Sequence, residues 1–284
     1  MPIILSLSQL DTEQQLWAAG PEGLFAVNQS GHNGDMLNPV PQPEQELYCC
    51  GVADDRVLVG GLPHGVAFSL DAGDNWQASW MDGVDAPVVC MAPDPRVAET
   101  GVILAGSAGG GILRTRNRGS SWWVSNFGLR DYSVLTLAWA PVAPDDVWPR
   151  REVVFAGTEE GIYRSPNAGL GWKRSEGFDG VCQVIAVSPH FHRDGLVLIG
   201  TEEIGLWRSQ DGGHTFTQVE GAPRRVDALT ANAAGWVLSN EEQLWSSPDG
   251  LTWSPLENTR PTLTLFTTSS GVWSGGEHGL ELIK

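Results

Sequence analysis

Cysteine is scarce in this chain of 284 residues, which has only four copies. Cys49 and Cys50 are adjacent, while Cys90 and Cys182 stand far apart in the sequence. No C-x-x-C pair of the kind that binds zinc or performs dithiol chemistry is therefore present. Because these cysteines fall in short, well-separated predicted strands, we expect buried free thiols rather than disulfides.

Basic residues are also few. The chain has 17 Lys and Arg against 34 Asp and Glu, which gives a formal net charge of −17. Neutralising a phosphate backbone requires clustered Lys and Arg, so this composition argues against nucleic-acid binding. The same charge disfavours anionic membrane surfaces, and it favours solubility and a protein partner with a basic surface.

Long apolar runs are the third absence. No stretch reaches the length of about 18 apolar residues that a transmembrane helix needs, so no membrane insertion is expected. The first eight residues, MPIILSLS, lack the basic region and the cleavage site of a secretory signal. We therefore expect a cytoplasmic protein.

What the chain does contain is one short motif, repeated five times. Each copy has Ser or Thr, then Asp or Asn two positions later, then a Gly, and finally an aromatic residue. The Asp or Asn side chain accepts hydrogen bonds from nearby N–H groups and the Gly suits a positive φ, so each copy predicts a hairpin turn. The aromatic residue is expected to anchor the next strand in the core. We call these segments the repeat turns: 69–76, 115–122, 165–172, 209–216 and 247–253.

Short predicted strands surround each repeat turn. An alternating strand that begins at a Gly comes directly before the turn, as in 161–165, and a strand ending in small residues comes before that, as in 153–157. A further strand lies earlier still, as in 134–138, and the segment after each turn supplies the last. Four strands in roughly 36 to 50 residues is the period of a β-propeller blade.

Two incomplete copies extend the count to seven units. Residues 16–26 and 272–282 match the middle strands of a blade without a repeat turn. The sequence thus predicts an all-β, seven-bladed β-propeller with four-stranded blades, as a single domain over residues 1–284. The last unit stops after its third strand, while residues 3–8 form the first strand of the first blade. We therefore expect a three-stranded last blade, whose open edge offers a site for a partner or a second copy.

The repeat turns resemble the Asp-box, or bacterial neuraminidase repeat, of a large β-propeller family. The likeness covers essentially the whole chain, and it is strongest to compact single-domain members that include the photosystem II assembly propellers. Residues 188–194 and the strand after them also look like that repeat. The resemblance implies a propeller but no single activity, because sialidases, xyloglucanases, lectins, sorting receptors and assembly factors all carry the motif.

The loops between the second and third strands of the blades are acidic. In a propeller these loops meet around one end of the central channel, so their side chains are expected to form a ring there that attracts a basic partner. The plainer interpretation is that these loops are solvated turns. The candidate residues are Glu22, His64, Glu159, Glu160, Glu202, Glu203, Glu241, Glu242, Glu277 and His278.

The loops that enter each blade lie at the same end of a propeller. Two of them carry the remaining candidate residues, Arg130 with Asp131 and the basic doublet Arg224 and Arg225. These arginines are expected either to pair with the glutamates or to bind an anionic ligand. An ordinary surface salt bridge is the alternative.

No metal or cofactor is expected. His190, His192 and Asp194 resemble a metal cluster, but they fall between a first and a second strand, where a structural turn is the better interpretation. The triple glycine 109–111 precedes a strand and not a helix, so it is no phosphate-binding loop. The repeat turns, like the loops between first and second strands, are expected at the end of the propeller opposite the acidic loops. Their carboxylates are expected to be structural.

The catalytic signatures that the resemblance implies are missing. The sialidase motif of the Arg-Ile-Pro type is absent, and Tyr163, one of three tyrosines, stands at a predicted core position. A xyloglucanase-like site needs two facing propellers. We therefore predict a non-enzymatic binding or scaffolding protein, of the kind that assists assembly of a larger complex. Two alternatives stay open, a carbohydrate-binding lectin and a glycoside hydrolase with two carboxylates.

Overall fold

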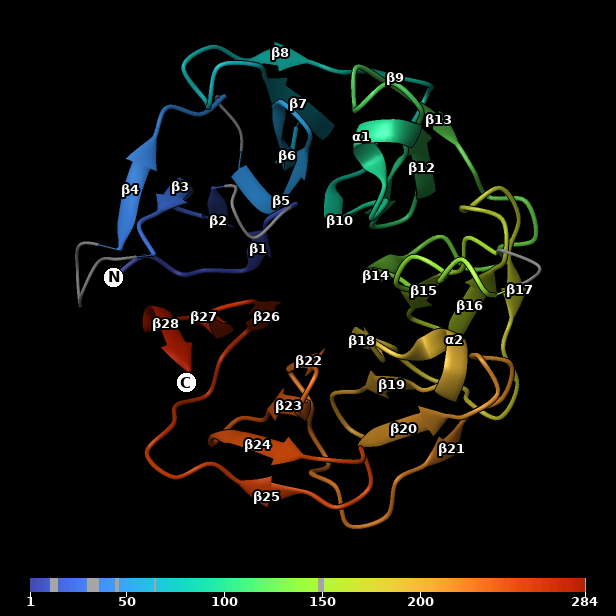
Figure 1. Ribbon diagram of the computed structural model, residues 1–284. Helices are drawn as coiled ribbons and strands as arrows, with labels where there is room; N and C mark the ends of the chain where they lie inside the picture. The colour runs from blue at the N-terminus through green and yellow to red at the C-terminus, as the bar shows by residue number, and fades with distance from the viewer. Residues whose placement is uncertain (11–14, 30–35, 44–45, 64, 148–150, 284) are drawn as a thin grey trace.

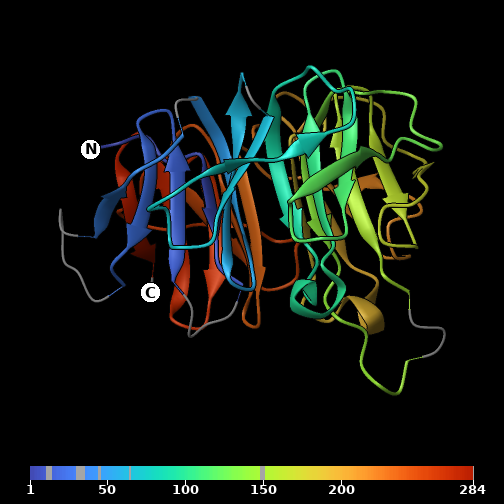
Figure 2. The ribbon, with the colours of Figure 1, turned by 90° about the horizontal axis from the view of Figure 1, so that it is seen from above.

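The computed structural model describes residues 1–10, 15–29, 36–43, 46–63, 65–147 and 151–283. Seven sheets stand around a central channel (Figure 1), which confirms the all-β, seven-bladed propeller. Two four-residue helices, α1 (Val97–Thr100) in blade 3 and α2 (Phe191–Asp194) in blade 5, lie at the same end of the channel (Figure 2). Within the described residues, no helix has the length and apolar character needed to cross a membrane.

Each blade is built from its inner strand outward. Blade 1 comprises β1 (Ser6–Ser8), β2 (Leu16–Gly20), β3 (Gly23–Val27) and β4 (Leu37–Val40). Blade 2 comprises β5 (Glu46–Ala53), β6 (Arg56–Leu62), β7 (Gly65–Ser69) and β8 (Gln77–Ala78). Blade 3 comprises β10 (Val88–Pro93), β11 (Ile103–Ser107), β12 (Gly111–Thr115) and β13 (Ser121–Val124). β9 (Trp80–Met81), in the connection from blade 2, adds to β13 as a fifth, parallel strand that the sequence did not predict.

The remaining blades repeat the same order. Blades 4 to 7 comprise β14 (Val134–Trp139), β15 (Val154–Thr158), β16 (Ile162–Ser165) and β17 (Lys173–Arg174); β18 (Val184–Val187), β19 (Val197–Gly200), β20 (Leu206–Ser209) and β21 (Thr217–Gln218); β22 (Ala228–Asn232), β23 (Gly235–Ser239), β24 (Leu244–Ser247) and β25 (Ser254–Pro255); and β26 (Thr264–Thr268), β27 (Gly271–Gly276) and β28 (Gly279–Ile283). Blade 7 therefore has three strands, as predicted.

The ring closes between blade 7 and blade 1 by packing and not by a shared sheet. β1 pairs with β2 as the inner strand of blade 1. Just before it, the Ile4 N–H donates to the Gly276 carbonyl oxygen at 3.2 Å. The Ile4 side chain fills the space over Gly275, where an added Cβ would lie 2.6 Å from its Cγ2 atom. Glycine is required here because the segment before β1 approaches the backbone of β27 directly.

Similar close contacts at glycines recur along the ring, and cysteine side chains take part in them. A Cβ at Gly60 would lie 2.6 Å from the Cys49 sulfur and 2.8 Å from a methyl group of Val88 in the next blade. All four cysteines are free, and Cys49, Cys50 and Cys182 are buried, which confirms the prediction of free thiols. Burial raises the pKa of Cys50 and of Cys90 to about 12, so neither is a thiolate at neutral pH.

The repeat turns form as predicted, at the same end of the channel as α1 and α2. In the first, the Ser69 hydroxyl donates to Asp71 at 2.8 Å and accepts from the Gly73 N–H at 2.8 Å, while Asp71 accepts from the Asn75 N–H. Gly73 has a φ of 98°, as a left-handed position requires. The buried aromatic anchor holds for Trp122, Trp172 and Phe216, but it is wrong for Trp76 and Trp253, which are only partly buried.

The repeat turns also join neighbouring blades. Three serine hydroxyl groups that follow the outer strands donate to the fifth-position carbonyl of the next turn, each at 2.6 Å: Ser79 to Gly119, Ser125 to Gly169 and Ser175 to Gly213. The Nε–H groups of Arg114 and Arg164 donate to the carbonyl one position earlier, on Ala168 and Gly212. These turns therefore hold the outside of the ring together.

Candidate partner-binding face

The acidic loops lie at the end of the channel opposite α1 and α2. The strands position them, because each loop joins the second strand of a blade to the third. His64 lies outside the described residues. The others are exposed, apart from the half-buried Asp131 and Arg225: Glu22, Glu159, Glu160, Glu202, Glu203, Glu241, Glu242, Glu277, His278, Arg130 and Arg224. We call this end of the molecule the acidic face.

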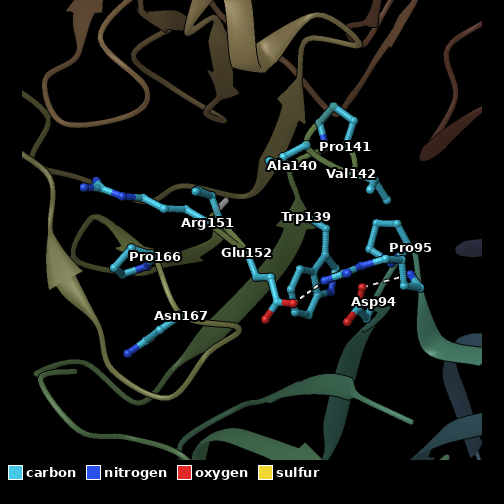
Figure 3. Close-up of a pocket in the computed structure, with 13 residues that line it drawn as sticks. Asp94, Pro95, Trp139, Ala140, Pro141, Val142, Arg151, Glu152, Pro166 and Asn167 are labelled. Carbon is cyan, nitrogen blue, oxygen red and sulfur yellow. Dashed lines mark hydrogen bonds and ion pairs between the residues drawn. The ribbon is translucent and has the colours of Figure 1, made fainter. Parts of the chain in front are cut away.

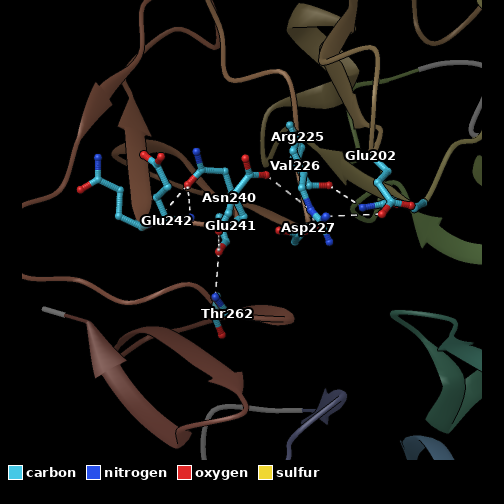
Figure 4. Close-up of polar contacts among 11 residues, drawn as sticks. Glu202, Arg225, Val226, Asp227, Asn240, Glu241, Glu242 and Thr262 are labelled. Atoms are coloured by element: carbon cyan, nitrogen blue, oxygen red, sulfur yellow. Dashed lines mark hydrogen bonds and ion pairs between the residues drawn. The ribbon is translucent and has the colours of Figure 1, made fainter.

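Arg225 joins three carboxylates across blades 5 and 6 (Figure 4). Its Nε–H donates to Asp227 at 2.7 Å, and its guanidinium lies 3.4 Å from Glu202 and 3.7 Å from Glu241. The hydrogen bond to Asp227 and the charge of Asp227 are the main causes of a raised pKa at Arg225, so this cation stays charged. Arg225 is therefore committed to the protein itself and is not free for an anionic ligand.

Two other candidate side chains also hold the loops in shape. Asp131 accepts from the backbone N–H groups of Ser133 and Glu160, at 2.9 Å each, and so ties the entry loop of blade 4 to its acidic loop. Glu22 accepts from the Ile3 N–H at 3.0 Å, close to the point of ring closure. These contacts are structural. Sequence analysis did not find the two that join separate segments, Asp131 to Glu160 and Glu22 to Ile3, because no local pattern brings those segments together.

Five glutamates have no such side-chain contact. Within the described part of the chain, no hydrogen bond or ion pair is recorded for the side chains of Glu159, Glu160, Glu203, Glu242 and Glu277. All five are exposed on the acidic face. These carboxylates are available to an incoming cation, whereas those of Glu202 and Glu241 already have one.

A groove of about 520 Å³ lies beside Glu203 in blade 5. Ile204, Trp207 and Val219 give it an apolar wall, and Glu203 with Glu220 and Arg224 gives it charged rims. The Trp207 ring is fixed edge-on against Phe178, with ring centroids 5.3 Å apart, and its indole N–H donates to the Ile204 carbonyl. An aliphatic stem that ends in a cation fits this combination of surfaces.

The channel itself is narrow. Its cavity of about 280 Å³ is lined by the inner strands of all seven blades, among them β1, β5 and β10. Tyr48, Cys49 and Cys90 face it, and Asp227 is the charged residue along its wall. Because Asp227 forms a hydrogen bond and an ion pair with Arg225, the charge on the channel wall is compensated.

The opposite end of the molecule has a cavity of about 420 Å³ between blades 3 and 4 (Figure 3). Arg96 forms an ion pair with Glu152 across it, and Asp94 accepts from the Arg96 N–H at 2.9 Å. His192, one member of the suspected metal cluster, lies near this end with its Nε2 2.7 Å from the Pro141 carbonyl. Among the described residues no group of three or more His, Cys, Asp or Glu side chains is placed to hold a metal ion.

Two exposed tryptophans lie on the outer side of blade 3. Trp80 of β9 is 55% exposed and Trp123 of β13 is 44% exposed, with ring centroids 5.9 Å apart. Their positions outside the repeated core register were the only sequence signal. The pairing follows from the fifth strand, which sequence analysis missed.

Known proteins share the fold and little sequence. No protein-family model and no curated protein matches the chain. YCF48 bound to D1 peptide has a TM-score of 0.74 at 14% identity, over 100% of this chain and 94% of that one. The WD40 β-propeller domain of Doa1 has a TM-score of 0.69 at 14% identity, over 98% and 91%.

A third solved structure is longer than this chain. The extracellular domain of the one component system BT4673 from B. thetaiotaomicron has a TM-score of 0.70 at 16% identity. The match covers 99% of this chain and 38% of that one, so this chain spans well under half of its length. At these identities the comparisons establish the seven-bladed propeller and nothing finer.

Proposed function

We propose that this protein is a non-enzymatic scaffold that binds a basic segment of a protein partner on its acidic face. The observation that carries the proposal is the group of five exposed glutamates with unpaired side chains, Glu159, Glu160, Glu203, Glu242 and Glu277, with a half-apolar groove beside one of them. Carboxylates arranged around one end of a chain with a net charge of −17 attract and orient cationic partners.

The groove in blade 5 supplies specificity. A Lys or Arg side chain of the partner lays its aliphatic stem against Ile204 and Val219 and its charge beside Glu203. The partly exposed Trp207 ring adds a cation–π contact. Arg224, at the rim, rejects a partner segment that is basic throughout and favours one with an acidic residue at that position.

The structural neighbours support a peptide as the ligand class. YCF48 is a propeller of the same fold and is bound to a D1 peptide. A role in assembling a larger complex and a cytoplasmic location form part of this proposal. The assembly role rests on the resemblance of the repeat turns to those of assembly propellers.

Titration of a hexalysine peptide, with hexaglutamate as the control peptide, tests the proposal by calorimetry. We expect binding that weakens as salt rises, and about threefold weaker binding for Glu203→Gln. Glu99→Gln removes the same charge from α1, at the opposite end of the molecule, and should bind like the wild type. Equal weakening by the two variants, or binding that ignores salt, would contradict the proposal.

Carbohydrate binding is a second candidate because Trp80 and Trp123 expose aromatic faces on which sugar rings stack. Under this alternative, the wild type binds on a glycan array and its signal survives high salt, whereas Trp123→Ala abolishes that binding. The scaffold proposal expects no glycan signal from the wild type or from Trp123→Ala, and no hydrolysis of aryl glycosides. A salt-resistant glycan signal that disappears in Trp123→Ala would therefore replace the first candidate with the second.

A further inference from the structure

The outer edge of blade 7 is a feature that the acidic face does not use. β28 pairs with β27 on its inner side, and no described strand lies on its outer side. In the neighbouring blades 1 and 6 that position is filled by β4 and β25 (Figure 1). In the other six blades, an outer strand occupies this position. Those blades therefore show which backbone groups of the third strand an outer strand bonds to.

The first apolar residue of each third strand shows where these bonds form. Its carbonyl oxygen accepts from a backbone N–H that follows the outer strand in five blades: from Ser79 to Val66, Ser125 to Ile112, Ser175 to Ile162, Val219 to Leu206 and Leu256 to Leu244. Its own N–H is capped by a side chain in three blades: Leu24 by Gln42, Ile112 by Asn126 and Leu244 by Thr259. Both groups of this residue therefore point away from the blade centre.

Leu280 is the corresponding residue of blade 7. It pairs with Gly275 as Ile112 pairs with Gly106, so its N–H and C=O point outward in the same way. No described residue forms a hydrogen bond with either group. Leu282, two positions on, has the same orientation because alternate residues of a strand direct their backbone groups to the same side. An unpaired row of this kind is a template for another strand.

The side chains of β28 indicate what such a strand looks like. Leu280 and Leu282 pack toward blade 1 in one cluster with Phe25 and Trp273, whereas Glu281 is exposed on the other side of the sheet. An added strand would extend the apolar layer with one set of its residues and face Glu281 with the alternate set. A basic residue in that second set gives a favourable cross-strand pair.

A second copy of this chain fits the edge poorly. Pairing β28 with its own counterpart would bring two copies of Glu281 close together, and like charges on facing strands destabilise the pairing. It would also join two molecules that each carry a net charge of −17. The charge of the edge therefore favours a different protein.

We infer that the outer edge of blade 7 is a strand-addition site for an extended segment of another protein, in which apolar and basic residues alternate. The segment completes the blade as an antiparallel fourth strand and forms backbone hydrogen bonds with Leu280 and Leu282. The inference is independent of the groove in blade 5, because its binding energy comes from the backbone and from β28 alone.

The probe is a fluorescent peptide of about eight residues in which Val and Lys alternate. Its binding is measured by fluorescence anisotropy in high salt, which suppresses attraction to the acidic face. Leu282→Pro removes an outward N–H, and Leu282→Ala shortens the same side chain but keeps that N–H. We expect about tenfold weaker binding to Leu282→Pro than to Leu282→Ala, with slower hydrogen exchange at Leu280 and Leu282 of the wild type on binding.

Charge reversal provides a test that does not depend on proline. Measured at moderate salt, where a directly facing pair of charges still acts, Glu281→Lys should exchange the preference for the Val–Lys peptide for a Val–Glu peptide. This result decides the matter if Leu282→Pro lowers stability far more than Leu282→Ala. Glu203→Gln should leave this binding unchanged even if it abolishes hexalysine binding. Equal affinities for both Leu282 variants and for Glu281→Lys would overturn the inference. So would edge amides that are already protected from exchange in the free protein, as self-association or another part of the chain would make them.

Discussion

The glycine at the fifth position of a repeat turn has two separate reasons to be glycine. Gly213 has a φ of 83°, and a Cβ there would lie 2.2 Å from a ring carbon of the buried Phe155. Gly221 has a similar φ of 77°, but a Cβ would meet nothing within 4 Å. A side chain at Gly213 would meet both backbone strain and steric overlap, whereas a side chain at Gly221 would meet backbone strain alone. Comparing the two positions therefore separates these effects.

We expect Gly213→Ala to lower the free energy of unfolding by about 3 to 5 kcal/mol and Gly221→Ala by about 1 kcal/mol. The smaller loss reflects the left-handed conformation alone. Both values come from urea denaturation followed by tryptophan fluorescence. Losses of equal size would show that Phe155 moves aside and that the turn tolerates a side chain.

The Asp of a repeat turn gives the protein a specific response to acid. Partial burial raises the pKa of Asp211, but hydrogen bonds from the Thr215 side chain and backbone, from Ser209 and from the His214 N–H outweigh it, and the pKa falls to about 2. A depressed folded-state pKa contributes stability above the ordinary value for Asp and loses it as the pH falls toward the folded-state value.

Asp211→Asn should remove this response and keep the turn, because Asn occupies the same position in the turns of Asn117 and Asn167. Between about pH 4 and about pH 2, we expect the melting temperature of the variant to fall less steeply than that of the wild type. Circular dichroism melts across that range measure both slopes. Parallel curves would assign the acid sensitivity to other groups.

At the scale of the element, the shortened turn of blade 6 explains an unusual arginine. Arg114 and Arg164 donate their Nε–H to the fourth-position carbonyl of the next repeat turn. Arg208 has the same register, but in the turn at 247–253 Gly250 occupies the fifth position, as its bond to Ser247 shows, and the fourth residue is missing. The buried Nε of Arg208 accordingly has no partner among the described residues.

Arg164→Met should therefore cost more than Arg208→Met. The first change leaves the Gly212 carbonyl without its donor, at about 1 to 3 kcal/mol, whereas the second removes a donor that is already unpaired. Chemical denaturation of both variants gives the difference. Equal losses would mean that the aliphatic stems, and not the hydrogen bond, account for the contribution of these arginines.

Strands and turns were predictable because each repeat carries its own period and its own turn chemistry. The exceptions have one cause, which is contact between repeats. β9 forms because the connection from blade 2 lies beside β13, and Trp76 stays partly exposed although its motif matches that of the buried Trp122. The acidic loops join the second strand of each blade to the third, as expected, but the pairing of their side chains was not predictable. Arg225 selects Glu202 and Glu241 across two blades through geometry that no local pattern contains.

At the scale of the whole molecule, the ring has one boundary that the chain does not cross. Blades 1 to 7 follow one another along the sequence, whereas blade 7 meets blade 1 only through contacts such as those of Ile4 with Gly275 and Gly276. Val226 occupies the equivalent place between blades 5 and 6, where its side chain covers Gly200. Truncating Ile4 weakens the boundary between blades 7 and 1, which only non-covalent contacts hold. Truncating Val226 weakens the boundary between blades 5 and 6, which the chain also crosses.

Ile4→Ala is expected to lower the free energy of unfolding by about 2 to 5 kcal/mol and Val226→Ala by a smaller amount, because it loses fewer buried methyl groups. The distinguishing readout is local. Hydrogen exchange should accelerate selectively in β1 and β26–β28 for Ile4→Ala, since blade 7 can separate from blade 1 without unfolding the rest. In Val226→Ala the connecting chain keeps the two blades together, so exchange should rise across the molecule in proportion to the lost stability. Local opening between blades 5 and 6 in Val226→Ala would show that packing, and not chain connectivity, sets where this ring opens.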